Sequence, residues 1–188
     1  VIHSDANDYN LIVGGGSDLY NRNQSITGII DFGDMVHSYT VGNLAIAAAY
    51  LLLDKPDPLA VAAEIVKGYH AAFALSENEI SALFGLINLR LCVSICLAAV
   101  QLAEQPENEY LAISQGPIRN TMAGLAAIPY GLATAIFRHA CGQEPVKGSN
   151  EVVTWLESQE FAPILGRDLG AEKTITLDLS IGTPLLPG

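Results

Sequence analysis

The chain has 188 residues, enough for one domain with a sizeable core, and 50% of them are hydrophobic. That apolar share excludes intrinsic disorder, which requires low hydrophobicity together with high charge. With 20 acidic residues against 9 basic ones, the net charge of −11 argues against nucleic acid and against a polybasic membrane-surface module.

The first 34 residues predict a β-hairpin. Residues 10–13 and 25–30 are short apolar runs typical of strands, and residues 14–24 between them are rich in turn formers. The glycines at 14–16 could suggest a phosphate-binding loop, but such a loop needs a helix directly after the glycines. Polar turn residues follow instead, so we expect a long hairpin loop and no phosphate cradle there.

From residue 41 onward the sequence predicts helices. The expected helices cover residues 42–53, 57–74, 77–104, 108–127, 130–141 and 151–159. Asp57 before Pro58 is typical of a helix start, and Ser76 with Glu79 forms a capping-box pattern. A strand-like alternation follows at 174–181. The expected fold class is therefore α+β and mainly α, with a helical body behind an N-terminal hairpin.

The helix expected at 77–104 is apolar nearly all round. Its most membrane-like part contains three polar residues, Asn88, Arg90 and Gln101, so we expect a buried core helix and no membrane contact. Cys92 and Cys96 share one face of this helix without a nearby His or acidic residue. We expect them to be buried, reduced thiols rather than metal ligands, which together with the lack of a signal peptide predicts a cytoplasmic protein.

Two polar clusters, at residues 1–10 and 28–34, stand out against the apolar background and are expected to carry the chemistry. Phosphoryl transfer needs a carboxylate that orients and deprotonates an alcohol, and hard oxygen ligands for Mg²⁺. His3-Ser-Asp5 followed after four residues by Asn10 has the spacing of a kinase catalytic loop. Asp31-Phe-Gly has the form of the second kinase motif. Because a hairpin joins the two clusters, we expect Asp5, Asn10 and Asp31 to converge.

These residues resemble the aminoglycoside phosphotransferase/choline kinase superfamily, and within it hydroxylysine kinase-like proteins. The segments that carry the similarity are 3–13, 27–41, 45–50, 68–70 and 106–110. The resemblance covers residues 1–141 and implies that residues 1–142 are the C-terminal lobe of a protein-kinase-like fold. It also implies ATP or GTP as phosphate donor, with Mg²⁺.

Carried over residue by residue, the resemblance implies that Asp5 is the catalytic base. Asn10 and Asp31 would bind Mg²⁺ and thereby the nucleotide, while His3 would brace the loop without doing chemistry. The alternative for Asp5, Asn10 and Asp31 is that they are plain turn residues, a frequent role of Asp and Asn.

Five further positions bear on the expected site. Asn7 and Asp8 lie between the expected base Asp5 and the expected metal ligand Asn10 and could contact the substrate. Asp34 is either a second acidic residue near the metal, where it could meet the amine of the substrate, or a plain surface acid. Asn43 stands where the superfamily often has an acid that braces the catalytic loop. Ser4 stands where a glycine is common, and we expect any small residue to serve.

Residues 143–188 are expected to be a linker and the start of a following domain. They resemble, more loosely, the joint in multidomain proteins in which a kinase-like domain precedes a class III aminotransferase. Pyridoxal phosphate would be needed only if such a domain exists downstream. The nucleotide-covering N-terminal lobe and its lysine are also expected outside the chain, so we expect this fragment alone to be inactive.

The acidic balance suits a small cationic amine-bearing substrate, such as an amino alcohol, a hydroxylated amino acid or an aminosugar. The resemblance implies that hydroxylysine-like amino acids rank first among these. One alternative is a kinase acting on an aminoglycoside, choline or homoserine. Another is a non-catalytic kinase-like binding module attached to a class III aminotransferase. A metal-dependent hydrolase is disfavoured because no His-x-x-x-His type of spacing is present.

Overall fold

Helices dominate the described part of the chain. The computed structural model describes residues 1–14, 25–105, 107 and 115–157. The chain divides into two compact units, Val1–Pro145 and Val146–Gly188. In the second unit the described residues hold α6 (Ser149–Glu157), where the sequence predicts a helix around Trp155. The strand expected at 174–181 lies outside the described residues, and the kind of domain that begins after residue 142 stays a prediction.

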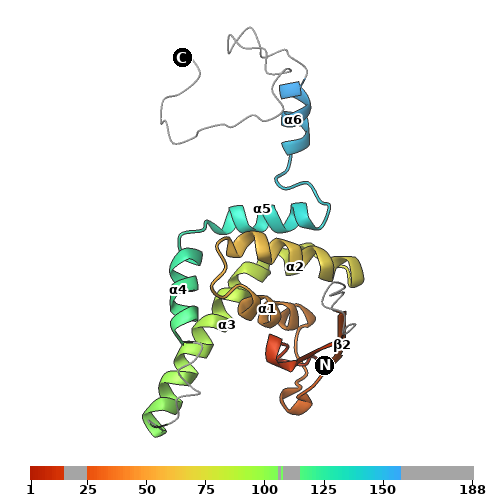
Figure 1. The fold of residues 1–188 in the computed structure, drawn as a ribbon. Helices are drawn as coiled ribbons and strands as arrows, with labels where there is room; N and C mark the ends of the chain where they lie inside the picture. The colour runs from red at the N-terminus through yellow and green to blue at the C-terminus, as the bar shows by residue number, and fades with distance from the viewer. Residues whose placement is uncertain (15–24, 106, 108–114, 158–188) are drawn as a thin grey trace, which may run out of the picture. The chain divides into compact units, whose positions relative to one another are not determined.

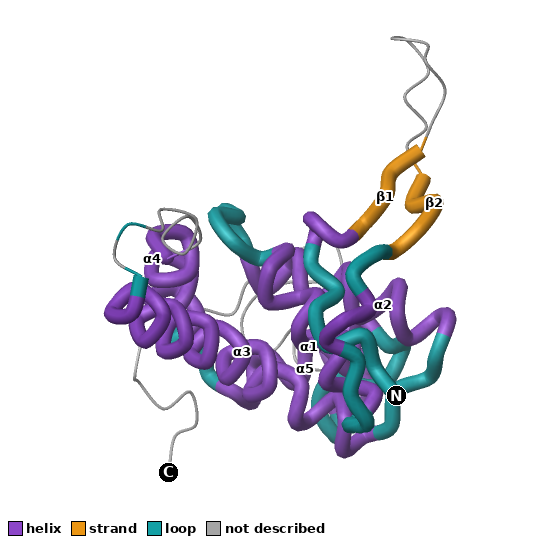
Figure 2. Tube along the Cα trace, turned by 90° about the horizontal axis from the view of Figure 1, so that it is seen from below, coloured by secondary structure: helices purple, strands orange, loops and turns teal. Residues whose placement is uncertain are grey.

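The predicted hairpin is confirmed. Strand β1 (Leu11–Gly14) pairs antiparallel with β2 (Ser25–Ile29), and an irregularity in the register falls between Ile12 and Val13. A Cβ at Gly14 would lie 2.6 Å from Cγ2 of Thr27, so only glycine lets the strands approach this closely. Figure 2 shows the hairpin projecting from the helices. Its large apolar side chains Ile12, Val13 and Ile26 are exposed.

The first two helices begin as their sequences predict. α1 (Thr40–Leu51) follows the second polar cluster, and α2 (Pro58–Ala72) begins at a proline after its N-cap Asp57. The Asp57 side chain accepts a hydrogen bond of 2.9 Å from the Ala60 N–H, which satisfies one free donor of the first turn. Small buried residues of α1, Ala45, Ala48 and Ala49, give α3 a smooth surface to pack against.

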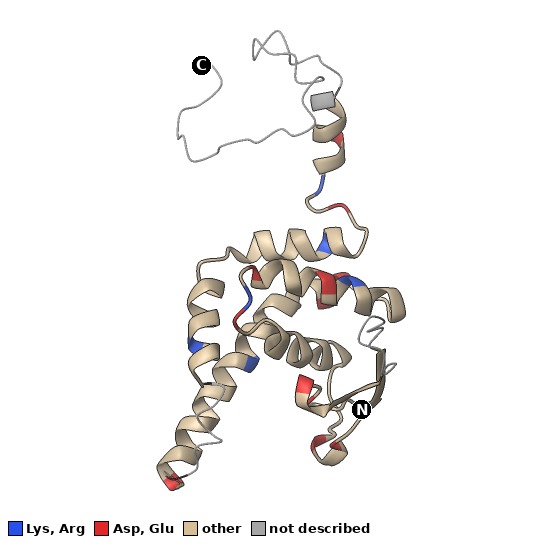
Figure 3. Ribbon diagram, in the orientation of Figure 1, with Lys and Arg blue, Asp and Glu red and all other residues tan. Residues whose placement is uncertain are grey.

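Helix α3 (Glu77–Glu104) has the predicted bounds and the predicted capping box. The Ser76 N–H donates to Glu79 Oε2 at 2.8 Å, and the Glu79 N–H donates back to Ser76 Oγ. The Ser76 hydroxyl, which donates to Glu79 Oε2 at 2.7 Å, and the Ser76 N–H both favour the charged carboxylate and lower the pKa of Glu79. Figure 3 shows how few charged residues interrupt this helix.

The expectation that α3 is a buried core helix holds only for its first half. Ile80, Leu83 and Ile87 there are fully buried, whereas Leu97 and Val100 in the second half are 53% and 59% exposed. Cys92 and Cys96 are also exposed, so their predicted burial is wrong. The reason is length: at 1.5 Å per residue α3 extends about 42 Å and α1 about 18 Å, so α1 cannot cover its whole face.

By length and composition alone, α3 could cross a membrane. Of its most apolar 18-residue window, 28% is buried. The core helix of a globular domain passes the same test, and the buried half of α3 packs against α1 and α5 (Tyr130–Ala140). The absence of membrane contact stays a prediction.

The remaining helices close the other side of the core. α4 (Gln115–Leu125) and α5 both pack on α3, and α2 runs beside α5 (Figure 1). The helix predicted at 108–127 is described only from residue 115. With one two-stranded antiparallel sheet among the described residues, the observed architecture is mainly α.

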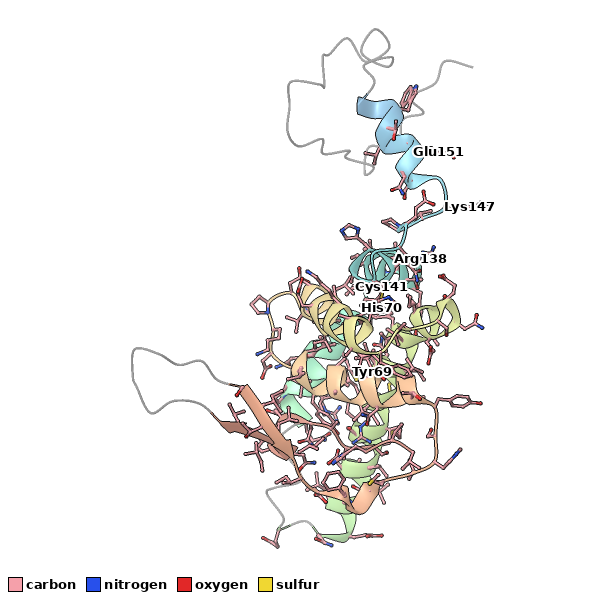
Figure 4. The ribbon with its side chains drawn as sticks, turned by 90° about the vertical axis from the view of Figure 1, so that its right-hand side faces the viewer. Tyr69, His70, Arg138, Cys141, Lys147 and Glu151 are labelled. Carbon is pink, nitrogen blue, oxygen red and sulfur yellow. The ribbon has the colours of Figure 1, made fainter. Side chains whose placement is uncertain are left out.

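Side-chain contacts fix the end of α2 and join α5 to the start of α3. His70 Nδ1 accepts a 3.1 Å hydrogen bond from the Leu75 N–H, which closes the end of α2. Arg138 of α5 pairs with Glu77 at the start of α3. Figure 4 shows Tyr69 and His70 of α2 near Arg138 and Cys141 of the α5 end. Burial raises the pKa of the Cys141 thiol, as expected for a packed and unreactive cysteine.

The burial of Phe137 predicts that truncating its side chain lowers the stability of the fold strongly. This side chain is fully buried, so Phe137→Ala should lower the free energy of unfolding by about 3–5 kcal/mol. Leu132→Ala on the same helix is the control, because Leu132 is 50% exposed and should cost about 1 kcal/mol or less. Chemical denaturation measures both changes. Equal effects of the two substitutions would contradict the described packing of α5.

Candidate active site

The carboxylate of Asp5 is the centre of the first polar cluster. Its Oδ2 accepts hydrogen bonds from the side-chain amides of Asn7, at 2.9 Å, and Asn10, at 3.0 Å. Its Oδ1 accepts from Arg90 Nη2 of α3 at 3.2 Å. The Asp5 side chain is 23% exposed, so it is partly shielded but still open to one side.

The side chain of Asn10 is held so that its amide oxygen stays available as a ligand. Its Nδ2 donates to both the backbone oxygen of Asp5, at 2.8 Å, and the Asp5 carboxylate. Both amide hydrogens therefore have partners on one residue. The side-chain oxygen accepts no hydrogen bond that the described residues supply, which leaves it free to bind a cation.

His3 ties the first cluster to the second. Its Nε2 lies 2.8 Å from the Ile30 carbonyl oxygen, and its Nδ1 accepts from the Asp5 N–H at 3.3 Å. This assigns the hydrogen to Nε2. The Ile30 N–H in turn donates to the Asn10 carbonyl oxygen at 2.9 Å. The two clusters, 27 residues apart between His3 and Ile30, are thus brought together as the hairpin predicts.

Asp31 directly follows Ile30 in the chain and is therefore close to Asn10. Its backbone has φ of 62°, in the left-handed region that Asp tolerates better than most residues. Asp31 is exposed, and no hydrogen bond or ion pair reaches its carboxylate from the described residues. Phe32, next in the chain, packs edge-on against His3 with ring centroids 5.2 Å apart. Asp34 ends the following short 3-10 helix and is also exposed.

The backbone of the loop at residues 3–10 is braced at Ser4. Its N–H donates to Asn43 Oδ1 of α1 at 3.2 Å, so the uncharged Asn43 braces this loop through its amide oxygen. Ser4 has φ of 70°, in the left-handed region that favours glycine. The requirement is on the backbone rather than on side-chain size alone.

A cavity of about 450 Å³ opens beside Asp5. One wall is the loop at residues 5–9, and the other is the end of α1 with the turn after it, from Tyr50 to Lys55. Asp5, Asn7 and Asp8 line this cavity. His3, Asn10, Asp31 and Asp34 are not among its lining residues, so the cavity lies on the Asp5 side of the cluster.

Sequence reasoning missed four residues of this region. They are Arg90 and Tyr50 beside Asp5, and Asp54 and Lys55 on the turn that lines the cavity. A signal existed only for Arg90, because it is the single charged residue between Glu79 and Glu104 in the sequence. The other three contribute to the site through tertiary contacts that no local pattern predicts.

The donor set fits a magnesium ion shared with a nucleotide. Within the described residues no group of three His, Cys, Asp or Glu side chains could hold a metal alone. Mg²⁺ usually takes only one or two protein ligands and completes its shell with water and substrate phosphates. The free oxygen of Asn10 and the unpartnered carboxylate of Asp31 are ligands of that kind.

The sequence is similar to hydroxylysine kinases from several vertebrates. It is 40% identical over 114 residues to hydroxylysine kinase of Danio rerio, covering 60% of this chain and 31% of that protein. It is 37% identical over 114 residues to the Bos taurus protein, covering 60% and 30%, and 34% identical over 114 residues to the Mus musculus protein, covering 60% and 30%.

These similarities support a kinase-like family. The chain spans about a third of the length of the curated relatives it matches. A scan against protein-family models finds no match, and no solved structure matches at a significant level.

The backbone at Ser4 predicts a stabilising substitution. Ser4→Gly should raise the free energy of unfolding by about 0.5–1 kcal/mol, because glycine adopts a positive φ without the steric cost that a Cβ imposes. Ser4→Ala is the control, since alanine is small but retains the Cβ. If Ser4→Ala stabilises the chain as much as Ser4→Gly in chemical denaturation, the positive φ is not the constraint at this position.

Proposed function

We propose that this chain is the acceptor-binding part of a small-molecule kinase. The reaction is transfer of the γ-phosphoryl group of ATP or GTP to the hydroxyl of an amino alcohol or a hydroxylated amino acid of the hydroxylysine type. One observation carries the proposal: the Asp5 carboxylate lines a cavity while Asn7, Asn10 and Arg90 hold it in place. The similarity to hydroxylysine kinases supports it.

Asp5 is the proposed base. Its Oδ2 already accepts two amide hydrogens, whereas Oδ1 accepts only from Arg90 and keeps a lone pair for an acceptor hydroxyl. As the acceptor oxygen forms its bond to the γ-phosphorus, the bond from phosphorus to the β–γ bridging oxygen breaks. The hydroxyl proton then passes to the Asp5 carboxylate.

Asn10 and Asp31 are the proposed magnesium ligands. Asn10 would bind through its side-chain oxygen, because its nitrogen is committed to Asp5, and Asp31 through its carboxylate. The bound ion would neutralise charge on the nucleotide phosphates. His3 would keep the two ligands adjacent through its contacts with Ile30 and Asp5.

The charges of the cavity fit an acceptor that carries both an amine and a carboxylate. Asp8 and Asp54 line it with negative charge and Lys55 with positive charge, and none of the three has an ion pair within the described residues. The turn is fixed, because the Asp54 N–H donates to the buried Thr121 Oγ1 at 3.2 Å. We propose that Asp8 and Asp54 contact the amine and that Lys55 contacts the carboxylate.

We propose that the nucleotide-covering lobe and its lysine come from sequence beyond these 188 residues. Apolar side chains near the proposed metal ligands are exposed, among them Ile29, Ile30, Phe32 and Met35. Exposed large apolar side chains that are this close together in the chain are typical of an interface. The 188 residues alone should therefore bind nucleotide weakly and transfer phosphate at no useful rate.

The test is phosphate transfer by the full-length protein that contains this chain. ATP and GTP are offered with Mg²⁺ and a panel of acceptors: 5-hydroxylysine, homoserine, ethanolamine, choline and an aminoglycoside. We expect turnover with amino-acid acceptors, and faster turnover with 5-hydroxylysine than with choline, which lacks a carboxylate. Transfer to none of these acceptors would contradict the proposal and favour a non-catalytic kinase-like binding module.

A matched pair of variants tests the role of Asp5. Asp5→Asn should lower kcat by about 10²–10⁴-fold, because the amide cannot accept the hydroxyl proton. Glu64→Gln removes an exposed acid of α2 that is paired only with Lys67, and should leave kcat unchanged. If Asp5→Asn retains kcat within a few-fold of the parent protein, Asp5 is not the base.

A further inference from the structure

Arg90 occupies an unusual place in α3. It is the only charged residue between Glu79 and Glu104, and it lies near the middle of this long apolar helix. Its side chain is 24% exposed. Partial burial of a charge is unfavourable unless a partner compensates for it, so the position of Arg90 has to be explained by its contacts.

The contacts of Arg90 converge on Asp5. Nη2 lies 2.9 Å from Tyr50 Oη and 3.2 Å from Asp5 Oδ1, and the guanidinium carbon lies 5.3 Å from the centre of the Tyr50 ring. Tyr50 Oη is also 3.1 Å from Ser94 Oγ, one turn further along α3. Arg90 Nε is buried and has no hydrogen-bond partner among the described residues. The guanidinium is therefore directed by Tyr50 and Ser94 toward one oxygen of Asp5.

The two oxygens of Asp5 are held by different parts of the molecule. Asn7 and Asn10 hold Oδ2 from within the same loop, whereas Arg90 holds Oδ1 from 85 residues away. Without Arg90, the carboxylate could pivot about its Oδ2 contacts. Oδ1 accepts one hydrogen bond from the described residues and so keeps a lone pair for the acceptor hydroxyl, and the direction of that lone pair would then vary.

We propose that Arg90 is a positioning residue for Asp5, and that Tyr50 directs Arg90. Arg90 fixes Asp5 Oδ1 against the helical body and keeps a positive charge beside the carboxylate throughout turnover. This inference rests on the proposed function, because it matters for catalysis only if Asp5 is the base.

The kinetic test uses the full-length protein with 5-hydroxylysine, ATP and Mg²⁺. Arg90→Ala should lower kcat by about 10²-fold, the cost of a base misplaced by about 1 Å, and leave the KM for ATP within about two-fold. Added guanidinium should restore at least part of the lost kcat, since it can occupy the space beside Asp5 and Tyr50. Arg119→Ala, which removes an exposed arginine of α4, should change neither value and should not respond to guanidinium.

Tyr50→Phe, alone and combined with Arg90→Ala, separates positioning from stability. Tyr50→Phe keeps the ring under the guanidinium but removes the hydroxyl that directs it, so kcat should fall less than in Arg90→Ala. The effects of Tyr50→Phe and Arg90→Ala should also be non-additive. Additive effects, or a loss in Arg90→Ala that guanidinium does not reverse, would overturn the inference.

A spectroscopic test judges Arg90 independently of turnover. In the 188-residue chain the side-chain amide signals of Asn7 and Asn10 report on Asp5, because both donate to its Oδ2. Arg90→Ala should shift these NMR signals and Arg119→Ala should not. If they do not move, Arg90 does not position Asp5. Absence of phosphate transfer by the parent protein would instead contradict the proposed function, whatever the NMR result.

Discussion

The carboxylate of Asp5 is held from two directions, and the arrangement of the site depends on this. Asn7 and Asn10 fix one oxygen from within the loop, and Arg90 fixes the other from α3. The partly shielded carboxylate keeps a fixed position when its two amide donors and its one guanidinium donor are all in place. The packing of α3 against α1 puts Arg90 in place, so the helical core determines the geometry of a loop far from it in sequence.

The loop that contains Asp5 is also hydrogen-bonded to the end of the hairpin. His3 is hydrogen-bonded to the carbonyl oxygen of Ile30, and the carbonyl oxygen of Asn10 accepts from the Ile30 N–H, which sets Asp31 next to Asn10 after the end of β2. Asp5 lines the cavity with its mixed charges, whereas the proposed metal ligands Asn10 and Asp31 are not among the lining residues. This division is what transfer between two substrates requires, because acceptor and nucleotide must approach the transferred phosphoryl group from opposite sides.

Local sequence patterns predicted the secondary structure well, because caps, turns and hydrophobic runs act within a few residues. The hairpin, the Asp57 cap and the capping box at Ser76 are of this kind. Burial was predicted less well. Cys92 and Cys96 are exposed because the partners of α3 are too short to cover it, and partner length is a tertiary property.

The candidate site shows the same limit. The spacing of His3, Asp5 and Asn10 predicted a cluster, and the structure connects these residues by hydrogen bonds. Arg90 was visible in the sequence as a charge in an apolar helix, but its partner 85 residues away was not. The cavity-lining turn at 54–55 gave only helix-end signals, because its role depends on α1 and the loop at 5–9 facing each other.

The central claim is that the two polar clusters form one nucleotide–metal site beside Asp5. Mn²⁺ with ADP, added to the full-length protein, tests it most directly through paramagnetic broadening of NMR signals. The account predicts that the signals of Asn10 and Asp31 broaden first and together, and that Asn10→Ala weakens the broadening at Asp31. Broadening at exposed acids such as Glu64, with Asn10 and Asp31 unaffected, would contradict it.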